Sequence, residues 1–249
     1  MMNDEQLQRY SRQIMVPEFD YQGQHKLLNA SVLIIGLGGL GSPVALYLAA
    51  AGIGKLVLAD DDVVDQSNLQ RQIIHGEANV GEAKVLSAQQ SIAAINSAVQ
   101  VVPLAQRLDA QALHEQVKLV DLVVDCSDNL ATRLAVNKSC LQLKTPLVSG
   151  AAIRMEGQVT VVDPRQNDKP CYHCLMRFTG PQDSRCSSNG VMAPVVGIVG
   201  AVQAMEAIKV IAHVGEPLVG KLLLLDAKNM HWQQFTLPKD DNCPSCGNG

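Results

Sequence analysis

The feature that most constrains the fold is a glycine-rich turn between a short apolar run and an apolar helical segment. Residues 31–36 read SVLIIG and are rich in β-branched side chains, while residues 40–51 have the composition of a helix. A buried parallel strand has this appearance, and a glycine turn after it can hold a phosphate at the helix N-terminus. The glycines of the turn are Gly36, Gly38, Gly39 and Gly41.

Strand-like and helix-like segments alternate from this turn to residue 150. Such alternation predicts an α/β fold with a Rossmann-like, doubly wound, mostly parallel sheet. The expected strands are residues 31–36, 55–60, 99–104, 119–126 and 146–150. The expected helices are residues 5–15, 40–51, 83–96, 110–117 and 130–143.

The pattern changes after residue 150. Strand-like segments at 157–163, 221–226 and 232–237 accompany one long helical segment at 194–213. Because only a few residues separate the last two strands, we expect a hairpin and interpret this half as an antiparallel extension of the same sheet. We expect one domain over residues 1–249, with a helical arm (1–17), a nucleotide-binding half (18–150) and this extension (151–249).

The composition excludes several classes of protein. The chain has 249 residues, of which 47% are hydrophobic and 18% charged, and this composition argues against disorder. A net charge of −4 and 3% aromatic residues argue against a nucleic-acid partner. The N-terminus lacks the basic and apolar regions of a signal peptide, and the apolar stretch 191–205 is too short to span a bilayer. We therefore expect a cytoplasmic protein with no membrane partner.

An acid after the second expected strand strengthens the prediction of a nucleotide site. Asp60 is positioned to accept a hydrogen bond from a ribose hydroxyl. This pattern fits a dinucleotide cofactor as well as ATP. An NAD-dependent dehydrogenase therefore remains an alternative when only the glycines and Asp60 are considered.

Further charged residues favour a triphosphate. Arg71 and Lys84 could neutralise phosphates, and Asp128 could ligate Mg²⁺. Taken alone, Arg71 and Lys84 are also typical of a solvated surface, and Asp128 with Asn129 of a helix N-cap. Strand ends in such a sheet line one crevice, however, and the joint placement of these residues there favours the site. The neighbouring polar residues expected to line the same site are Asp62, Asn68, Gln72 and Asn129.

The chain contains seven cysteines, and four of them form two CxxC pairs. Four thiolates favour a closed, structural Zn²⁺ site, with redox pairs or incidental cysteines as the alternatives. The pairs are Cys171 with Cys174 and Cys243 with Cys246, each in a segment that looks turn-rich. His173 is an alternative ligand, although we expect it to be a neighbouring bystander. We expect Cys126 and Cys140 to be buried in the core. Cys186 lies beside Arg185 in a polar loop, and both a covalent role and an inert exposed thiol remain open.

Several motifs together resemble a known family over nearly the whole chain. They are RYSRQ at 9–13, GLGGLG at 36–41, LAD at 58–60, SNLQRQ at 67–72, Lys84, DCSDN at 125–129 and the two CxxC pairs. With these motifs the chain resembles the bacterial ubiquitin-activating-type adenylyltransferases of the MoeB/ThiF/HesA group. Residues 149–158 and 190–194 look like the molybdopterin branch, MoeB, whereas residues 56–62 look more like the thiamine branch, ThiF.

The resemblance implies a function. Family members use ATP to adenylate the C-terminal glycine carboxylate of a ubiquitin-like, MoaD-like sulfur carrier that ends in Gly-Gly, and release pyrophosphate. It implies ATP, Mg²⁺ and Zn²⁺ as cofactors, with Asp60 on the ribose, Asn68, Arg71 and Lys84 on ATP, and Asp128 on Mg²⁺.

The resemblance also implies an assembly and leaves alternatives. Family members are homodimers in which the residue matching Arg12 reaches the partner's nucleotide, and in the thiamine branch the cysteine matching Cys186 transfers sulfur. Activation of a ThiS-like carrier, a tRNA-modifying dehydratase of the same family and a non-catalytic carrier-binding scaffold are the alternatives.

Overall fold

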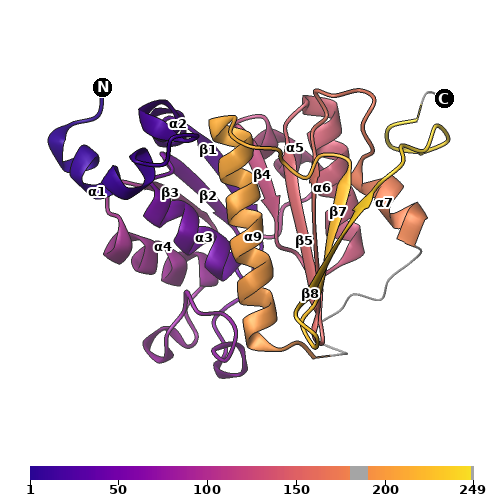
Figure 1. The fold of residues 1–249 in the computed structure, drawn as a ribbon. Coiled ribbons are helices and arrows are strands. Elements are labelled where there is room, and N and C mark those ends of the chain that lie inside the picture. Colours follow the sequence, from indigo (N-terminus) through magenta and orange to yellow (C-terminus); the bar gives the residue numbers. More distant parts are fainter. Residues whose placement is uncertain (180–189, 248–249) are drawn as a thin grey trace.

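The computed structural model describes residues 1–179 and 190–247 and contains one eight-stranded sheet (Figure 1). The strand order is β3-β2-β1-β4-β5-β6-β7-β8. The strands are β1 (Ser31–Ile35), β2 (Lys55–Ala59), β3 (Gln100–Leu104), β4 (Leu122–Asp125), β5 (Leu147–Ile153), β6 (Glu156–Val162), β7 (Lys221–Asp226) and β8 (His231–Thr236).

The sheet is parallel in its first part and antiparallel in its second. Strands β1 to β5 pair in parallel, and β5, β6, β7 and β8 pair in an antiparallel meander. Ile35 on β1 is in register with Ala59 on β2 and with Asp125 on β4, so these strands end at the same level. The predicted parallel core, its antiparallel extension and the final hairpin are therefore confirmed.

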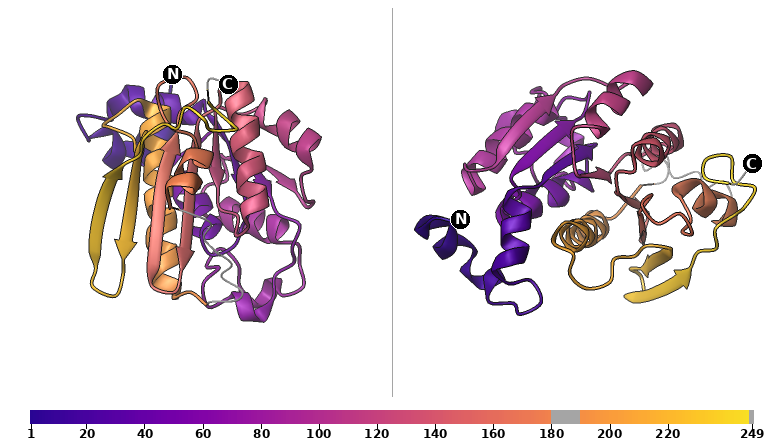
Figure 2. Two further views of the ribbon diagram at one scale, coloured as in Figure 1. Left: turned by 90° about the vertical axis from the view of Figure 1, so that its right-hand side faces the viewer. Right: turned by 90° about the horizontal axis from the view of Figure 1, so that it is seen from above.

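Helices cover both faces of the sheet (Figure 2). The α-helices are α1 (Asp4–Ile14), α2 (Asp20–Leu28), α3 (Gly41–Ala51), α4 (Lys84–Ile95), α5 (Ala110–Val117), α6 (Leu130–Leu143), α7 (Tyr172–Thr179) and α9 (Ala193–Ala212), and two short 3₁₀ turns are η1 (Gln66–Asn68) and η2 (Glu77–Asn79). The sequence did not predict α2 or α7. Helix α2 carries Gly23 in its middle, where the Phe19 ring packs closely, and α7 contains a CxxC pair that looks like a turn.

Each face of the sheet has its own apolar core. On β1, Val32 and Ile34 join the core under α3, α4 and α9, whereas Leu33 and Ile35 join the core under α5, α6 and α7. All four side chains are less than 9% exposed. The continuous apolar run of β1 is explained by this burial on both faces, because side chains alternate along a strand.

Helix α9 lies along the middle of the sheet. With 20 residues, the helix is long and apolar enough to cross a membrane. The sequence had indicated a shorter apolar stretch, residues 191–205, which would not span a bilayer. In the structure α9 packs against α3, β5 and β6, and 56% of its apolar window is buried. It is thus a core helix of this fold, and its buried Gln203 donates to the carbonyl oxygen of Asp125 over 2.9 Å.

Candidate functional site

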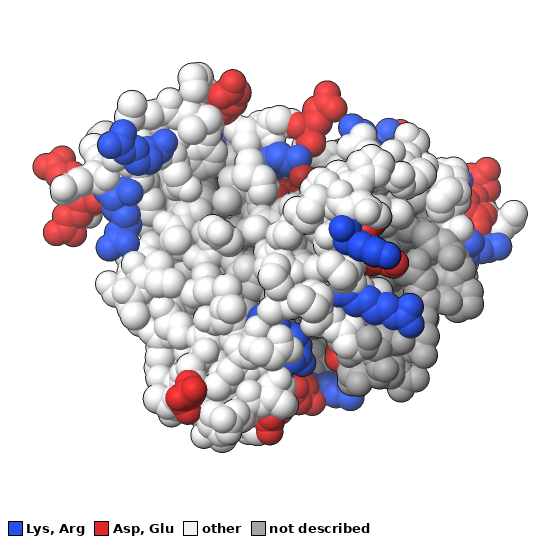
Figure 3. All heavy atoms as spheres, turned by 60° about the horizontal axis from the view of Figure 1, so that its bottom comes forward, with Lys and Arg blue, Asp and Glu red and all other residues white. Residues whose placement is uncertain are grey.

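A cavity of about 590 Å³ lies at the carboxyl ends of the parallel strands. Strand β1 stands between β2 and β4, and in doubly wound sheets ligands bind where the strand order reverses in this way. On this end of the molecule, acidic and basic side chains border a hollow in an otherwise largely uncharged surface (Figure 3). The predicted residues that line the cavity are Gly36, Gly38, Gly39, Asp60, Asp62, Asn68, Arg71, Gln72, Lys84, Asp128 and Asn129.

The glycine turn is packed so tightly that side chains are excluded at two positions. Gly36 has a φ of +90°, and a Cβ there would lie 2.9 Å from the carbonyl oxygen of Cys126. A Cβ on Gly41 would lie 1.9 Å from the carbonyl oxygen of Gly36, so Gly41 closes the turn and does not line the cavity. At Gly38 the nearest neighbour of a Cβ would be Gln72 Nε2, at 3.6 Å. The backbone at Gly38 is therefore open to a ligand.

Asp60 fixes the glycine turn to the end of β2. Its Oδ2 accepts from the Leu37 N–H at 2.6 Å, and its Oδ1 accepts from the Asp62 N–H at 2.9 Å. Burial raises the pKa of Asp60, while the positive charge of Lys84 acts in the opposite direction. Because a carboxylate oxygen can accept more than one hydrogen bond, Asp60 can still accept one from a ribose hydroxyl.

Lys84 is a buried cation at the cavity. It is the first residue of α4, its side chain is 5% exposed, and its Nζ lies 2.7 Å from Oδ2 of the exposed Asp62. A buried charge needs a partner, and here the partner can turn into solvent. An anionic ligand could therefore replace Asp62 as the partner of Lys84.

Three polar residues follow the acidic segment. Asn68 ends η1, whose first turn is capped by Asp65, and the Arg71 Nη1 donates to the carbonyl oxygen of Ser67 over 3.2 Å. Gln72 is 4% exposed, and its Oε1 has no hydrogen-bond partner within residues 1–179 and 190–247. This buried acceptor lines the cavity and could be satisfied by a donor group of a ligand.

The loop after β4 supplies Asp128. The side chain of Asp128 is exposed at the cavity and has no hydrogen-bond or ion-pair partner among the described residues. Asn129 instead caps α6, because its Oδ1 accepts from the Thr132 N–H at 2.9 Å. Asn129 lines the cavity as predicted, but its side-chain oxygen is already engaged in this cap.

The structure adds lining residues that the sequence did not predict. They include Gln106, Arg107, Ser127 and Arg133. Arg107 follows β3, so the rule that strand ends meet in one crevice could have indicated it. Arg133 lies one turn into α6 and is 3% exposed, and nothing in its sequence context distinguishes it from a surface arginine.

Besides Gly41, the predicted site residue Arg12 does not line this cavity. Arg12 is exposed on α1 and borders a separate, mainly apolar groove with Tyr47 and Met205, of which the latter two are 57% and 52% exposed. Cys186 lies outside the described residues.

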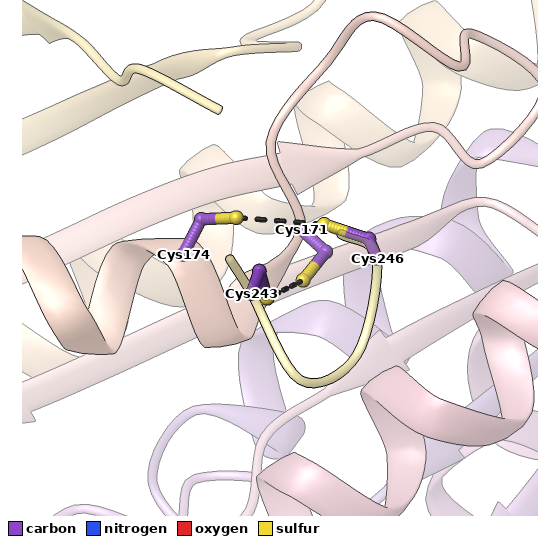
Figure 4. A group of neighbouring side chains, drawn as sticks. All are labelled: Cys171, Cys174, Cys243 and Cys246. Atoms are coloured by element: carbon purple, nitrogen blue, oxygen red, sulfur yellow. Dashed lines mark hydrogen bonds between the residues drawn. The ribbon is translucent and has the colours of Figure 1, made fainter. Parts of the chain in front are cut away.

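The two CxxC pairs come together in space (Figure 4). All four sulfur atoms lie within 4.8 Å of one another, with 3.7 Å between Cys171 and Cys243 and 3.5 Å between Cys174 and Cys246. A tetrahedral site with Zn–S bonds of about 2.3 Å would separate its sulfurs by about 3.8 Å. The cluster is thus compatible with zinc in donor type, number and spacing.

The surroundings of the cysteines also agree with a metal site. The first pair was expected in a turn, but it lies at the start of α7. His173 hydrogen-bonds to Ser245 at 2.9 Å, as a bystander would. Burial raises the pKa of Cys171 to about 11, so a cation is needed to hold it as a thiolate. Cys126 and Cys140 are buried in the core, as predicted.

A doubly wound sheet with a glycine turn, a cation and carboxylates in one crevice is typical of nucleotide-binding α/β enzymes. Within this class the chain belongs to the ThiF family, whose model matches residues 10–245. It is 46% identical over 246 residues to the molybdopterin-synthase adenylyltransferase of Salmonella typhimurium, covering 99% of this chain and 98% of that protein. It is 45% identical to the sulfur carrier protein ThiS adenylyltransferase of Escherichia coli, covering 99% and 97%.

A solved structure shares the fold. E. coli MccB, crystallised with ATP, superposes with a TM-score of 0.82 at 26% identity and covers 96% of this chain and 73% of that chain. Together with the family match, these relatives identify the chain as an enzyme of the adenylyltransferase type. The predicted resemblance is confirmed.

Proposed function

We propose that the chain adenylates the C-terminal glycine carboxylate of a ubiquitin-like sulfur carrier with ATP, in molybdopterin cofactor biosynthesis. The observation that carries the proposal is the meeting of Lys84, Arg71 and Asp128 at one glycine turn. Names of relatives support the substrate class, since they include both a molybdopterin-synthase and a ThiS adenylyltransferase. A ThiS-like carrier is therefore the second candidate, and incubation with each carrier followed by mass measurement distinguishes them.

The nucleotide would bind along the strand ends. The phosphates would face the backbone at Gly38 and the start of α3, where the helix dipole favours negative charge. Lys84 and Arg71 would neutralise the outer phosphates, while Asp60 and Asn68 would hold the nucleoside. The roles of Gln72 and Asp62 follow from their contacts: one offers a buried acceptor, and the other is the counter-ion that ATP displaces.

Asp128 is the best candidate for Mg²⁺. Carboxylates of Asp60, Asp61 and Asp62 also cluster within 4.8 Å, but Asp60 accepts two backbone N–H bonds and Asp62 pairs with Lys84. Asp128 carries no such partner among the described residues. Mg²⁺ is held by one or two carboxylates together with phosphates and water, so Asp128 would be sufficient.

The chemistry requires no general base. A C-terminal carboxylate has an ordinary pKa of about 3.5 and is ionised near neutral pH, so it can attack the α-phosphorus directly. Attack forms the acyl-phosphate bond, and the bond from the α-phosphorus to pyrophosphate breaks. The barrier comes from the approach of two anions and from the charge on the leaving group, and Lys84, Arg71 and the turn backbone stabilise both.

The remaining residues would support this reaction from outside the cavity. The four cysteines would hold a structural Zn²⁺, which supplies no open coordination position for catalysis. A second copy of the chain would cover the groove beside α1, and its Arg12 would complete the site. Residues 18–150 and 151–249 would work as one unit, because α9 from the second half packs on β4 and β5. We place this unit in the cytoplasm.

The test is carrier-dependent exchange between ATP and pyrophosphate. We expect Asp128→Ala to lower exchange at least 100-fold, in line with about 2.7–4 kcal/mol for the loss of one charge-stabilising group. Glu115→Ala, which removes an exposed carboxylate on α5, is the control. Wild-type exchange in Asp128→Ala would remove Asp128 from the mechanism. Tight NADH binding without ATP binding would favour a dehydrogenase, and carrier binding without pyrophosphate release would favour a scaffold.

A further inference from the structure

A buried polar bridge joins the cavity to the cysteine cluster, and the proposed function does not use it. At its centre is Arg133 on α6, which is 3% exposed. Its Nη2 and Nε donate to the carbonyl oxygen of Ser127 over 2.8 and 3.3 Å, and its Nη1 donates to Tyr172 Oη over 3.3 Å. One guanidinium thus contacts the loop of Asp128 and the residue that stands between Cys171 and Cys174.

A second contact fastens the same helix face to the cluster. Asn137 lies one turn after Arg133 on α6, so both side chains leave the helix on one side. Its Oδ1 accepts from the Tyr172 N–H at 2.9 Å, and its Nδ2 lies 3.7 Å from the Cys171 sulfur. Tyr172, which is 2% exposed, is therefore held at both its backbone and its hydroxyl group.

The other end of the bridge is equally buried. Asp125, at the end of β4, is 0% exposed, and its Oδ1 accepts from the backbone N–H of Ser127 at 3.0 Å and from the hydroxyl of Ser127 at 2.7 Å. Burial raises the pKa of Asp125, and the positive charge of Arg133 opposes that rise. The Asp125 carboxylate thus holds the N–H of Ser127, and the Arg133 guanidinium holds its carbonyl oxygen. Ser127 directly precedes Asp128.

Simple stability does not explain this arrangement. Buried charges are costly, and apolar side chains of similar volume often pack with equal or greater stability. What the charges add is a fixed position for the peptide between Ser127 and Asp128. A metal at the cysteines would hold Cys171 and Cys174, and with them Tyr172, in one place, so its effect can extend to that peptide.

We propose that Arg133 is a positioning residue for the adenylation site, which sets the loop of Asp128 and, through the Tyr172 hydroxyl, couples the cysteine cluster to the binding of Mg²⁺ and ATP. The inference rests on the proposed function. Coupling between two sites is reciprocal and typically changes affinity about 5- to 150-fold.

The experiment measures ATP binding by calorimetry over a Mg²⁺ titration, together with protein-bound zinc. Tyr172→Phe removes one oxygen and leaves the cysteines in place, while Arg133→Lys keeps the charge beside Asp125 but cannot span both partners. We expect each variant to need at least about fivefold more Mg²⁺ for half-maximal ATP affinity. For Tyr172→Phe, whose side chain does not line the cavity, ATP binding without added Mg²⁺ is expected to stay unchanged.

Controls separate positioning from stability. Tyr21→Phe removes another tyrosine hydrogen bond, the one from the N–H of Met2, and is expected to keep the Mg²⁺ dependence of the wild type. If Tyr172→Phe loses zinc, Arg133→Lys still tests the bridge, since it does not touch a cysteine. Wild-type Mg²⁺ dependence in Arg133→Lys would overturn the inference. Failure of the wild-type chain to bind ATP would instead overturn the proposed function.

Discussion

At the scale of single residues, two glycines of the turn have different roles: one allows tight packing, and the other leaves the backbone open to a ligand. Gly41 is required because a Cβ would lie 1.9 Å from a carbonyl oxygen, whereas a Cβ at Gly38 has nothing closer than 3.6 Å. The glycine pattern itself predicts a phosphate-facing backbone at Gly38 and close helix packing at Gly41. The distances agree with this division into a ligand position and a packing position.

A matched pair of variants tests this division. We expect Gly41→Ala to destabilise the fold by about 1–3 kcal/mol or more, because the backbone must move. Gly38→Ala should fold normally but bind ATP about tenfold more weakly, which corresponds to about 1.4 kcal/mol. Chemical denaturation and ATP calorimetry measure the two effects. An unchanged ATP affinity in folded Gly38→Ala would contradict the assigned ligand position.

His75 is a second residue whose role the sequence did not reveal. Its Nε2–H donates to the carbonyl oxygen of Leu37 in the glycine turn, at 3.1 Å, and its Nδ1 accepts from the Ser87 hydroxyl at 2.8 Å. Only the bond that Nδ1 accepts needs the neutral ring, because Nε2–H can donate in either charge state. Burial, followed by the nearby charge of Lys84, lowers the pKa of His75 from its ordinary 6.5.

The direction of the pH effect follows from proton binding. Below pH 6.5 the unfolded chain protonates His75 while the folded chain keeps it neutral, so stability is lost as the pH falls from 6.5 towards the lowered pKa. The loss reaches at most about 1.4 kcal/mol per pH unit for one proton. Urea denaturation between pH 7.5 and pH 5 should show a steeper loss in the wild type than in His75→Gln. Parallel curves would contradict this role of His75.

At the scale of elements, sequence patterns predicted those parts whose structure is decided locally. The buried strands β1, β2 and β4 have continuous apolar runs, and the helices after β1 and β4 start at Gly41 and at the capping residue Asn129. Helix α2 was missed because Gly23 in its middle has a low helix propensity, and α7 was missed because a tertiary contact fixes its start. Phe19 packs over Gly23 in α2, and Asn137 receives the first N–H of α7.

The cysteine cluster is the element-scale feature with the clearest test. It ties the segment after β8 to α7, where Arg177 also donates to the Asn242 carbonyl oxygen at 2.7 Å. We expect about one zinc per wild-type chain, and Cys243→Ser should lose the metal and destabilise the fold, because the metal offsets the burial of the thiolates. Metal analysis and thermal unfolding measure both effects.

Cys140 provides the matched control for this variant. It is 0% exposed, lies on α6 outside the cluster, and belongs to the apolar core on the same face of the sheet. Cys140→Ala should lose some stability through the cavity it leaves but retain the zinc. Gently purified wild-type protein without zinc, or Cys243→Ser with full zinc content, would refute the metal site.

At the scale of the whole molecule, one chain presents the cavity at the glycine turn and, apart from it, a groove that carries Arg12. The groove lies between α1, α3 and α9 and exposes Tyr47 and Met205. Sequence reasoning could assign Arg12 a role through family resemblance alone, because no local pattern says that a residue acts on another copy. The proposed two-fold dimer would resolve the separation, since each copy would send its Arg12 into the cavity of the other.

Hybrid dimers test that arrangement directly. Arg12→Ala and Asp128→Ala should each abolish carrier-dependent exchange as homodimers. When the two inactive proteins are mixed and allowed to exchange subunits, each hybrid dimer contains one site with an intact Arg12 and an intact Asp128. Random pairing makes about half of the dimers hybrids with one working site of two, so activity should return to about a quarter of the wild-type value. If Arg12 acted within its own chain, no site in any hybrid would be complete and activity would stay absent.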